Sequence, residues 1–186
     1  ISAADAAESG LPSLFSEVPF GIPNEPLPSK EALGFRVPLY GFDRWSKIFA
    51  TRQMFALGTF VKHTRSARIA LADVGYPDDW IEGICGLLAL AVDRVANRAS
   101  TLCIWNMKAQ EIEQTFARFA LPILWDFAES CPVGNASGNY SSEIDRVSLV
   151  CSHLATTTTE ESAQVLNQSA VLAPGTTFDV VLTDPP

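Results

Sequence analysis

Apolar residues recur every three or four positions along most of residues 43–154. This period predicts a block of helices rather than a sheet. The predicted helices are a short one after Asp43, one at 52–72, one at 77–97, one from Lys108 towards Pro122, and one at 143–154. Residues 84–92 are apolar nearly all round, so we expect the helix at 77–97 to be central and buried.

Regular structure is not expected before this block. Residues 1–40 hold six of the twelve prolines, and proline removes a backbone donor and disrupts a helix interior. This composition predicts an extended arm or linker that lies over a surface, with a candidate short strand at 34–38.

Strand character follows the helical block. Residues 164–170 alternate loosely between apolar and polar, Pro174-Gly175 makes a turn, and 178–182 form an apolar run typical of a buried strand. The predicted fold class is therefore mostly α, with two strands of an incomplete sheet at the end. We expect three parts: an arm or linker at 1–40, a helical domain or insertion at 41–155, and the strands within 160–186.

Charge and cysteine usage restrict the possible functions. The formal net charge is −8, but the middle of the chain is mildly basic and both ends are acidic. A basic middle can face a phosphate backbone. The four cysteines form no C-x-x-C pair, and His63 and His153 are far apart, so no metal site is predicted. Cys85 lies in the apolar run at 84–92, where we expect a buried reduced thiol, and this favours a reducing, cytoplasmic location. No apolar stretch is long enough to span a membrane.

The apolar run at 178–182 leads into Asp184-Pro185-Pro186. A carboxylate at the carboxyl edge of a sheet lies where open α/β folds bind ligands. Methyl transfer to an exocyclic amine needs acceptors for the amine protons. Asp184 and a carbonyl of the rigid Pro185-Pro186 segment would supply them by positioning and electrostatics. The alternative is that these three residues are only a turn at a strand end.

The strand pair before this motif resembles that of amino-group methyltransferases that use S-adenosyl-L-methionine. Similar stretches lie upstream, at Thr51-Arg52-Gln53, at 118–122 and at 125–129. Together they make residues 39–186 resemble the large prokaryotic adenine-specific DNA methyltransferases with an N-terminal domain of unknown function. The chain looks like an internal fragment of such an enzyme.

The resemblance implies roles for particular residues. Asp184, Pro185 and Pro186 would be catalytic, Ser169 would contact the cofactor, and the sheet would be a Rossmann-like methyltransferase sheet. Two features of the family are missing, the Phe-x-Gly-x-Gly cofactor loop and the aromatic residue after the second proline. The fragment alone is therefore expected to be inactive.

A candidate for DNA contact lies in the helical block. Lys62, Arg65 and Arg68 fall on one face of the predicted helix at 52–72, where they can meet phosphates. The alternative is an ordinary solvated helix face. Trp105 and Trp125 are interpreted as core residues rather than as platforms for bases.

The function predicted is methylation of an exocyclic amine of DNA, with adenine N6 favoured. Because the Asp-Pro-Pro motif does not determine which base is methylated, an RNA or cytosine-N4 methyltransferase is an alternative. A non-catalytic helical interaction module is another.

Overall fold

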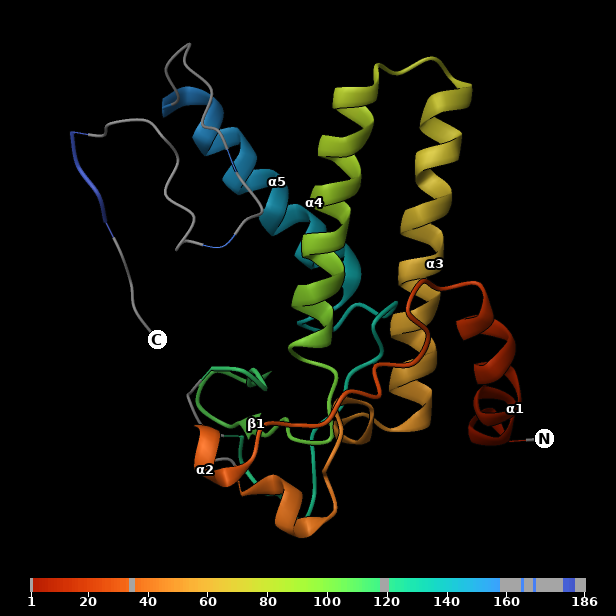
Figure 1. The fold of residues 1–186 in the computed structure, drawn as a ribbon, viewed down its shortest axis with the longest axis vertical. Coiled ribbons are helices and arrows are strands. Elements are labelled where there is room, and N and C mark those ends of the chain that lie inside the picture. The colour runs from red at the N-terminus through yellow and green to blue at the C-terminus, as the bar shows by residue number, and fades with distance from the viewer. Residues whose placement is uncertain are drawn as a thin grey trace.

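The protein is mostly helical. The computed structural model describes residues 2–33, 36–117, 121–157, 165, 169 and 179–182. Its helices are α1 (Ala3–Ser16), α2 (Lys30–Leu33), α3 (Thr51–Asp73), α4 (Asp78–Ala96) and α5 (Tyr140–Thr157), with 3-10 turns at Val37–Tyr40 and Trp45–Ile48. The long helices pack in chain order, α1 on α3, α3 on α4 and α4 on α5 (Figure 1). The helices predicted at 52–72, 77–97 and 143–154 are confirmed.

The expectation of an extended arm is wrong for the first part of the chain, because α1 is a helix. Its start is stabilised by a capping box, in which the Ser2 hydroxyl accepts from the Asp5 amide at 3.2 Å and the Asp5 carboxylate accepts from the Ser2 amide at 3.0 Å. Alanine, the strongest helix former, fills most of the first two turns. These local preferences and the packing of Leu14 and Phe15 near α3 outweigh the cost of Pro12 inside the helix.

Helices α3 and α4 form an antiparallel pair (Figure 1). Gly75, in the left-handed region at a φ of 85°, makes the sharp connection between them. Pro77 precedes α4, and Asp78 and Asp79 lie in its first turn, where negative charge is favourable.

Helix α4 is less buried than its composition predicts. Ile81, Ala91, Val92 and Val95 are buried, whereas the apolar side chains between them include several that are exposed, Leu90 by 53%. Among the described elements, α3 and α5 are the two that pack extensively along α4. Two neighbours do not surround a helix, so one of its apolar sides stays open to solvent.

The helix expected from Lys108 is a short hairpin instead. Strands β1 (Trp105–Asn106) and β2 (Glu111–Ile112) are antiparallel, with Trp105 opposite Ile112. The Asn106 side-chain oxygen accepts from the amides of Lys108 and Ala109 at 3.0 and 2.9 Å, and Gln110 has a φ of 53°. This side-chain turn competes with the helix for the same backbone donors.

The described residues of the predicted terminal strands are not in a sheet. Residues 165, 169 and 179–182 have no strand pairing, and Val180, Val181 and Leu182 are 71%, 71% and 91% exposed. Their expected burial is therefore wrong. A strand forms only when a neighbour satisfies its backbone groups, and β1 and β2 are the only strands among the described residues. The rest of both predicted strands lies outside the described residues.

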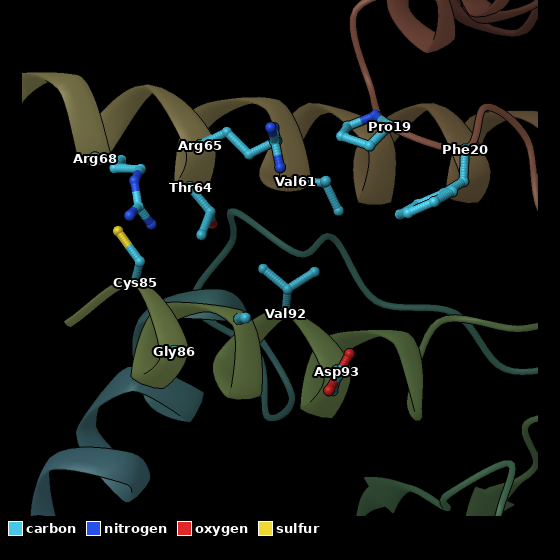
Figure 2. Close-up of a pocket in the computed structure, with 11 residues that line it drawn as sticks. Pro19, Phe20, Val61, Thr64, Arg65, Arg68, Cys85, Gly86, Val92 and Asp93 are labelled. Atoms are coloured by element: carbon cyan, nitrogen blue, oxygen red, sulfur yellow. The ribbon is translucent and has the colours of Figure 1, made fainter. Parts of the chain in front are cut away.

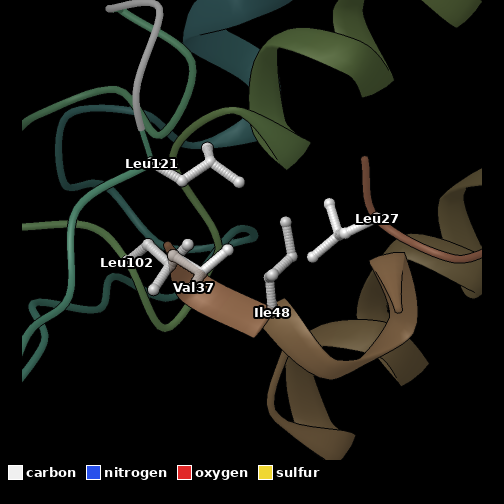
Figure 3. Close-up of a cluster of buried hydrophobic side chains, with 5 residues drawn as sticks. All are labelled: Leu27, Val37, Ile48, Leu102 and Leu121. Carbon is white, nitrogen blue, oxygen red and sulfur yellow. The ribbon is translucent and has the colours of Figure 1, made fainter. Parts of the chain in front are cut away.

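The base of the molecule is held by a buried cluster drawn from distant parts of the chain. Leu27, Val37, Ile48, Leu102 and Leu121 meet there (Figure 3). The Thr101 amide and hydroxyl both donate to the Ile48 carbonyl, at 2.8 and 2.9 Å. This cluster fixes the lower end of α3 against the segment that follows α4, and so positions the groove described next.

Candidate nucleic-acid interface

A groove of about 590 Å³ lies between α3 and α4 (Figure 2). Val61 of α3 and Ala89 and Val92 of α4 form its apolar walls. Gly86 also lines it, and a Cβ atom there would meet nothing within 4 Å. The groove stays open because α4 presents small side chains to this part of α3.

The structure brings two of the three predicted cationic residues to this groove. Arg65 and Arg68 line it from α3. Lys62 lies one turn earlier and forms an ion pair with Glu17, which follows α1, at 2.7 Å. Lys62 does not line the groove and is occupied by a contact within the protein, so a cationic face shared by all three residues stays a prediction.

Arg65 carries the free positive charge of the groove. Arg68 donates a short hydrogen bond to the Glu82 carboxylate of α4. That hydrogen bond holds the pKa of Glu82 below its ordinary value and raises the pKa of Arg68. The exposed side chain of Arg65 makes no ion pair with any described residue. An anion that enters the groove therefore meets Arg65 without displacing a partner.

The other end of the groove holds an aromatic ring and a carboxylate that sequence reasoning missed. Phe20 is fully exposed and has a φ of 65°, and Asp93 is exposed on α4. Along the groove, Arg68 and Cys85 lie at one end, Arg65 and Thr64 between, and Phe20 towards the Asp93 end (Figure 2). The Phe20-Gly21 pair was a signal of a tight turn, but nothing in the sequence placed it beside α4.

The predicted catalytic residues cannot be placed. Asp184, Pro185 and Pro186 lie outside the described residues. Ser169, the predicted cofactor contact, is exposed. The roles of these four residues stay predictions.

Two tryptophans predicted to be core residues are exposed. Trp105 is on β1 and Trp125 lies in the irregular segment before α5, and both rings face solvent. The prediction failed because it relied on the apolar character of the two rings and not on an assigned helix or strand. A hairpin and a surface segment do not bury a ring as a helix face does.

A second charged cluster is structural. The Glu143 side chain at the start of α5 is fully buried, and Arg94 of α4 donates a short hydrogen bond to it. Arg98 and Arg146 have nitrogen atoms 4.0 and 3.9 Å from its other oxygen. Arg98 also donates to the Ile112 carbonyl at 2.9 Å. The cluster joins α4, α5 and the hairpin below the groove.

The remaining chemistry of the described part is limited. It contains no group of three or more His, Cys, Asp or Glu side chains placed to hold a metal ion. The four cysteines are free. Within the same part of the chain, we find no helix with the length and apolar character needed to cross a membrane.

Comparison of the chain with protein-family models, with curated proteins and with solved structures finds no match.

Proposed function

We propose that the chain is part of an S-adenosyl-L-methionine-dependent DNA methyltransferase that acts on an exocyclic amine, with adenine N6 as the favoured target. The observation that carries the proposal is the Asp184-Pro185-Pro186 motif after an apolar run. Asp184 would accept an amine proton, and the proline carbonyls would orient the nitrogen for attack on the methyl group. The two strands at 164–170 and 178–182 would belong to a Rossmann-like sheet.

The exposed apolar run before the motif supports this proposal. Val180, Val181 and Leu182 gain about 1.5–3 kcal/mol each from full burial, and they are largely exposed here. An apolar run with no partner is suited to join a larger sheet. That sheet would also carry the cofactor loop.

The groove between α3 and α4 supports contact with the DNA. Arg65 forms no ion pair with a described residue, Arg68 lines the same groove, and Lys62 lies one turn earlier on α3. Cations along one helix face neutralise phosphates and give salt-dependent binding. RNA offers the same phosphate charge, so an RNA methyltransferase, like a cytosine-N4 enzyme, is tested by changing the substrate.

The catalytic assignment is tested by measuring methyl transfer to DNA. The assay uses a protein that contains both this chain and a Phe-x-Gly-x-Gly cofactor loop. We expect Asp184→Ala to abolish methyl transfer to DNA and to leave binding of S-adenosyl-L-methionine intact. Asp179→Ala, a matched acidic position, should keep its activity. Normal DNA methylation by Asp184→Ala would show that the assignment is wrong.

A non-catalytic interaction module is the second candidate, and one observation favours it. A groove of about 790 Å³ lies between α4 and α5. Exposed apolar side chains line it: Leu87, Leu90, Leu149, Val150 and Leu154. Such a contiguous apolar surface is typical of a protein-binding site. Absence of methyl transfer in the test above would leave this as the better function.

A further inference from the structure

We propose that the α3–α4 groove binds one nucleotide unit whose base carries an exocyclic amino group. The base stacks on Phe20, its amino group donates to Asp93, and its phosphate binds Arg65. This inference rests on the proposed nucleic-acid contact of α3, but it requires no methyl donor and no catalytic motif.

The size and lining of the groove fit such a ligand. Its volume of about 590 Å³ lies within the range of about 300–1,000 Å³ usual for small-molecule sites. Its walls are apolar, and its charged groups are spread along its length, with Asp93 near one end and the arginines beyond Val61 (Figure 2). A nucleotide is divided in the same way, because its base is planar and apolar with polar edges and its phosphate is anionic.

Phe20 lines the groove but adds nothing to the packing of the fold. Its ring is fully exposed, so it contributes no burial to the core. Its backbone is left-handed, at a φ of 65°, which is unfavourable for a bulky residue. The Gly21 amide donates to the Val18 carbonyl at 3.3 Å and closes this turn. Backbone strain of this kind concentrates at binding sites, and an exposed aromatic face is a platform for a base.

Asp93 determines which bases fit. Its carboxylate is exposed and makes no ion pair with any described residue. A carboxylate only accepts hydrogen bonds, so it requires donors from the base. Adenine, cytosine and guanine offer amino groups. Thymine offers one N–H between two carbonyl oxygens, which repel the carboxylate.

Arg65 supplies the phosphate contact. Its planar guanidinium matches two oxygens of a phosphate, and it is not engaged by a carboxylate as Arg68 is by Glu82. Thr64 lies beside it, and its hydroxyl oxygen has no hydrogen-bond partner.

The test measures binding of the full chain to fluorescent single-stranded oligodeoxyadenylate and oligodeoxythymidylate of equal length, and to free dAMP. We expect the adenylate to bind more tightly than the thymidylate. Phe20→Gly should weaken adenylate binding about tenfold, because stacking is lost, without lowering the thermal midpoint. Asp93→Asn should remove the preference between the two oligonucleotides, and Arg65→Gln should weaken both equally.

Matched controls separate the groove from general charge effects. Gly86 lines the groove, so Gly86→Leu should fill it and block binding. Gly83 lies on α4 outside the groove, so Gly83→Leu should leave binding unchanged. At both positions a Cβ atom would meet nothing within 4 Å, so neither substitution is expected to clash. Asp73→Asn and Arg36→Gln change exposed charges elsewhere and should leave the preference unchanged.

The outcomes distinguish this inference from the proposed function. In one outcome, both oligonucleotides bind equally and neither Phe20→Gly nor Asp93→Asn changes their binding. This result would overturn the groove site but would retain the cationic contact with DNA. Binding of dAMP without binding of oligonucleotides would support the groove site and would show that its ligand is a free nucleotide. The same result would contradict the proposed contact with DNA. No binding of any probe would overturn both, while the Asp184 experiment would still decide methyl transfer.

Discussion

Glu143 lies at the centre of the charged cluster that joins α4, α5 and the hairpin. Its carboxylate is fully buried and is surrounded by Arg94, Arg98 and Arg146. A buried charge is tolerated only when it is paired and hydrogen-bonded. Here it also offsets Arg98, whose side chain is only 7% exposed.

We expect Glu143→Gln to lower the free energy of unfolding by about 3 kcal/mol, because it breaks the ion pair between a fully buried carboxylate and Arg94 and leaves buried Arg98 with Glu111 as its remaining carboxylate partner. Urea denaturation followed by circular dichroism measures this change. Arg146→Gln is the matched control; that side chain is 48% exposed, so its loss should cost less than about 1 kcal/mol. Equal effects of the two variants would show that Glu143 is not the centre of the cluster.

At the scale of elements, the contact between α1 and α3 depends on glycine at position 58. A Cβ atom there would lie 2.8 Å from the Phe15 ring and 3.0 Å from Leu14. Both side chains belong to a buried cluster that includes Val18 and Met54, so they have little space to move. The close approach of the two helices therefore requires the missing side chain.

Two glycine substitutions test this packing. Gly83→Ala on α4 meets no neighbour within 4 Å and should raise the free energy of unfolding by about 1 kcal/mol, through helix propensity alone. Gly58→Ala has the same propensity gain but also a clash, and should be about 2 kcal/mol less stable than Gly83→Ala. Thermal denaturation of both variants measures the difference. A similar gain at both positions would mean that α1 moves freely on α3.

The elements also show how far local sequence predicts structure. Helices α3, α4 and α5 were predictable because their apolar period is long and agrees with their packing. The hairpin at β1 and β2 was not, because Ile112 and Phe116 fit helical spacing equally well and the turn at Asn106 decides between the two. Helix α1 was hidden by Pro12 and by the prolines that follow it.

At the scale of the whole molecule, exposed carboxylates link stability to pH. The pKa of Glu82 is lowered by its hydrogen bond with Arg68, and that of Asp43 by its hydrogen bond with Lys47. A backbone hydrogen bond lowers the pKa of Glu31. A lowered pKa means that the folded state binds protons less readily than the unfolded state. The contribution is therefore complete above the ordinary values of 4.5 for Glu and 3.8 for Asp.

We expect stability to fall as the pH drops below these values and through the folded-state pKa of each group. Glu82→Gln removes one such group, so its stability deficit relative to the unsubstituted protein should be present at neutral pH and vanish in acid. Thermal midpoints across this pH range, at low and high salt, measure the effect. Because the pair is exposed, high salt should reduce the deficit. A deficit that persists in acid would exclude the ion pair as its cause.

Sequence by itself determined the mostly helical character, the approximate positions of three long helices and the motif that carries the methyltransferase proposal. These properties depend on residue types and on spacings of a few positions, and both can be read directly from the sequence. Tertiary structure alone decided that Phe20 and Asp93 line one groove, that Arg65 forms no ion pair with a described residue, and that Leu90 faces solvent. Contacts of this kind join residues dozens of positions apart, and only the packing of one helix on another brings them together.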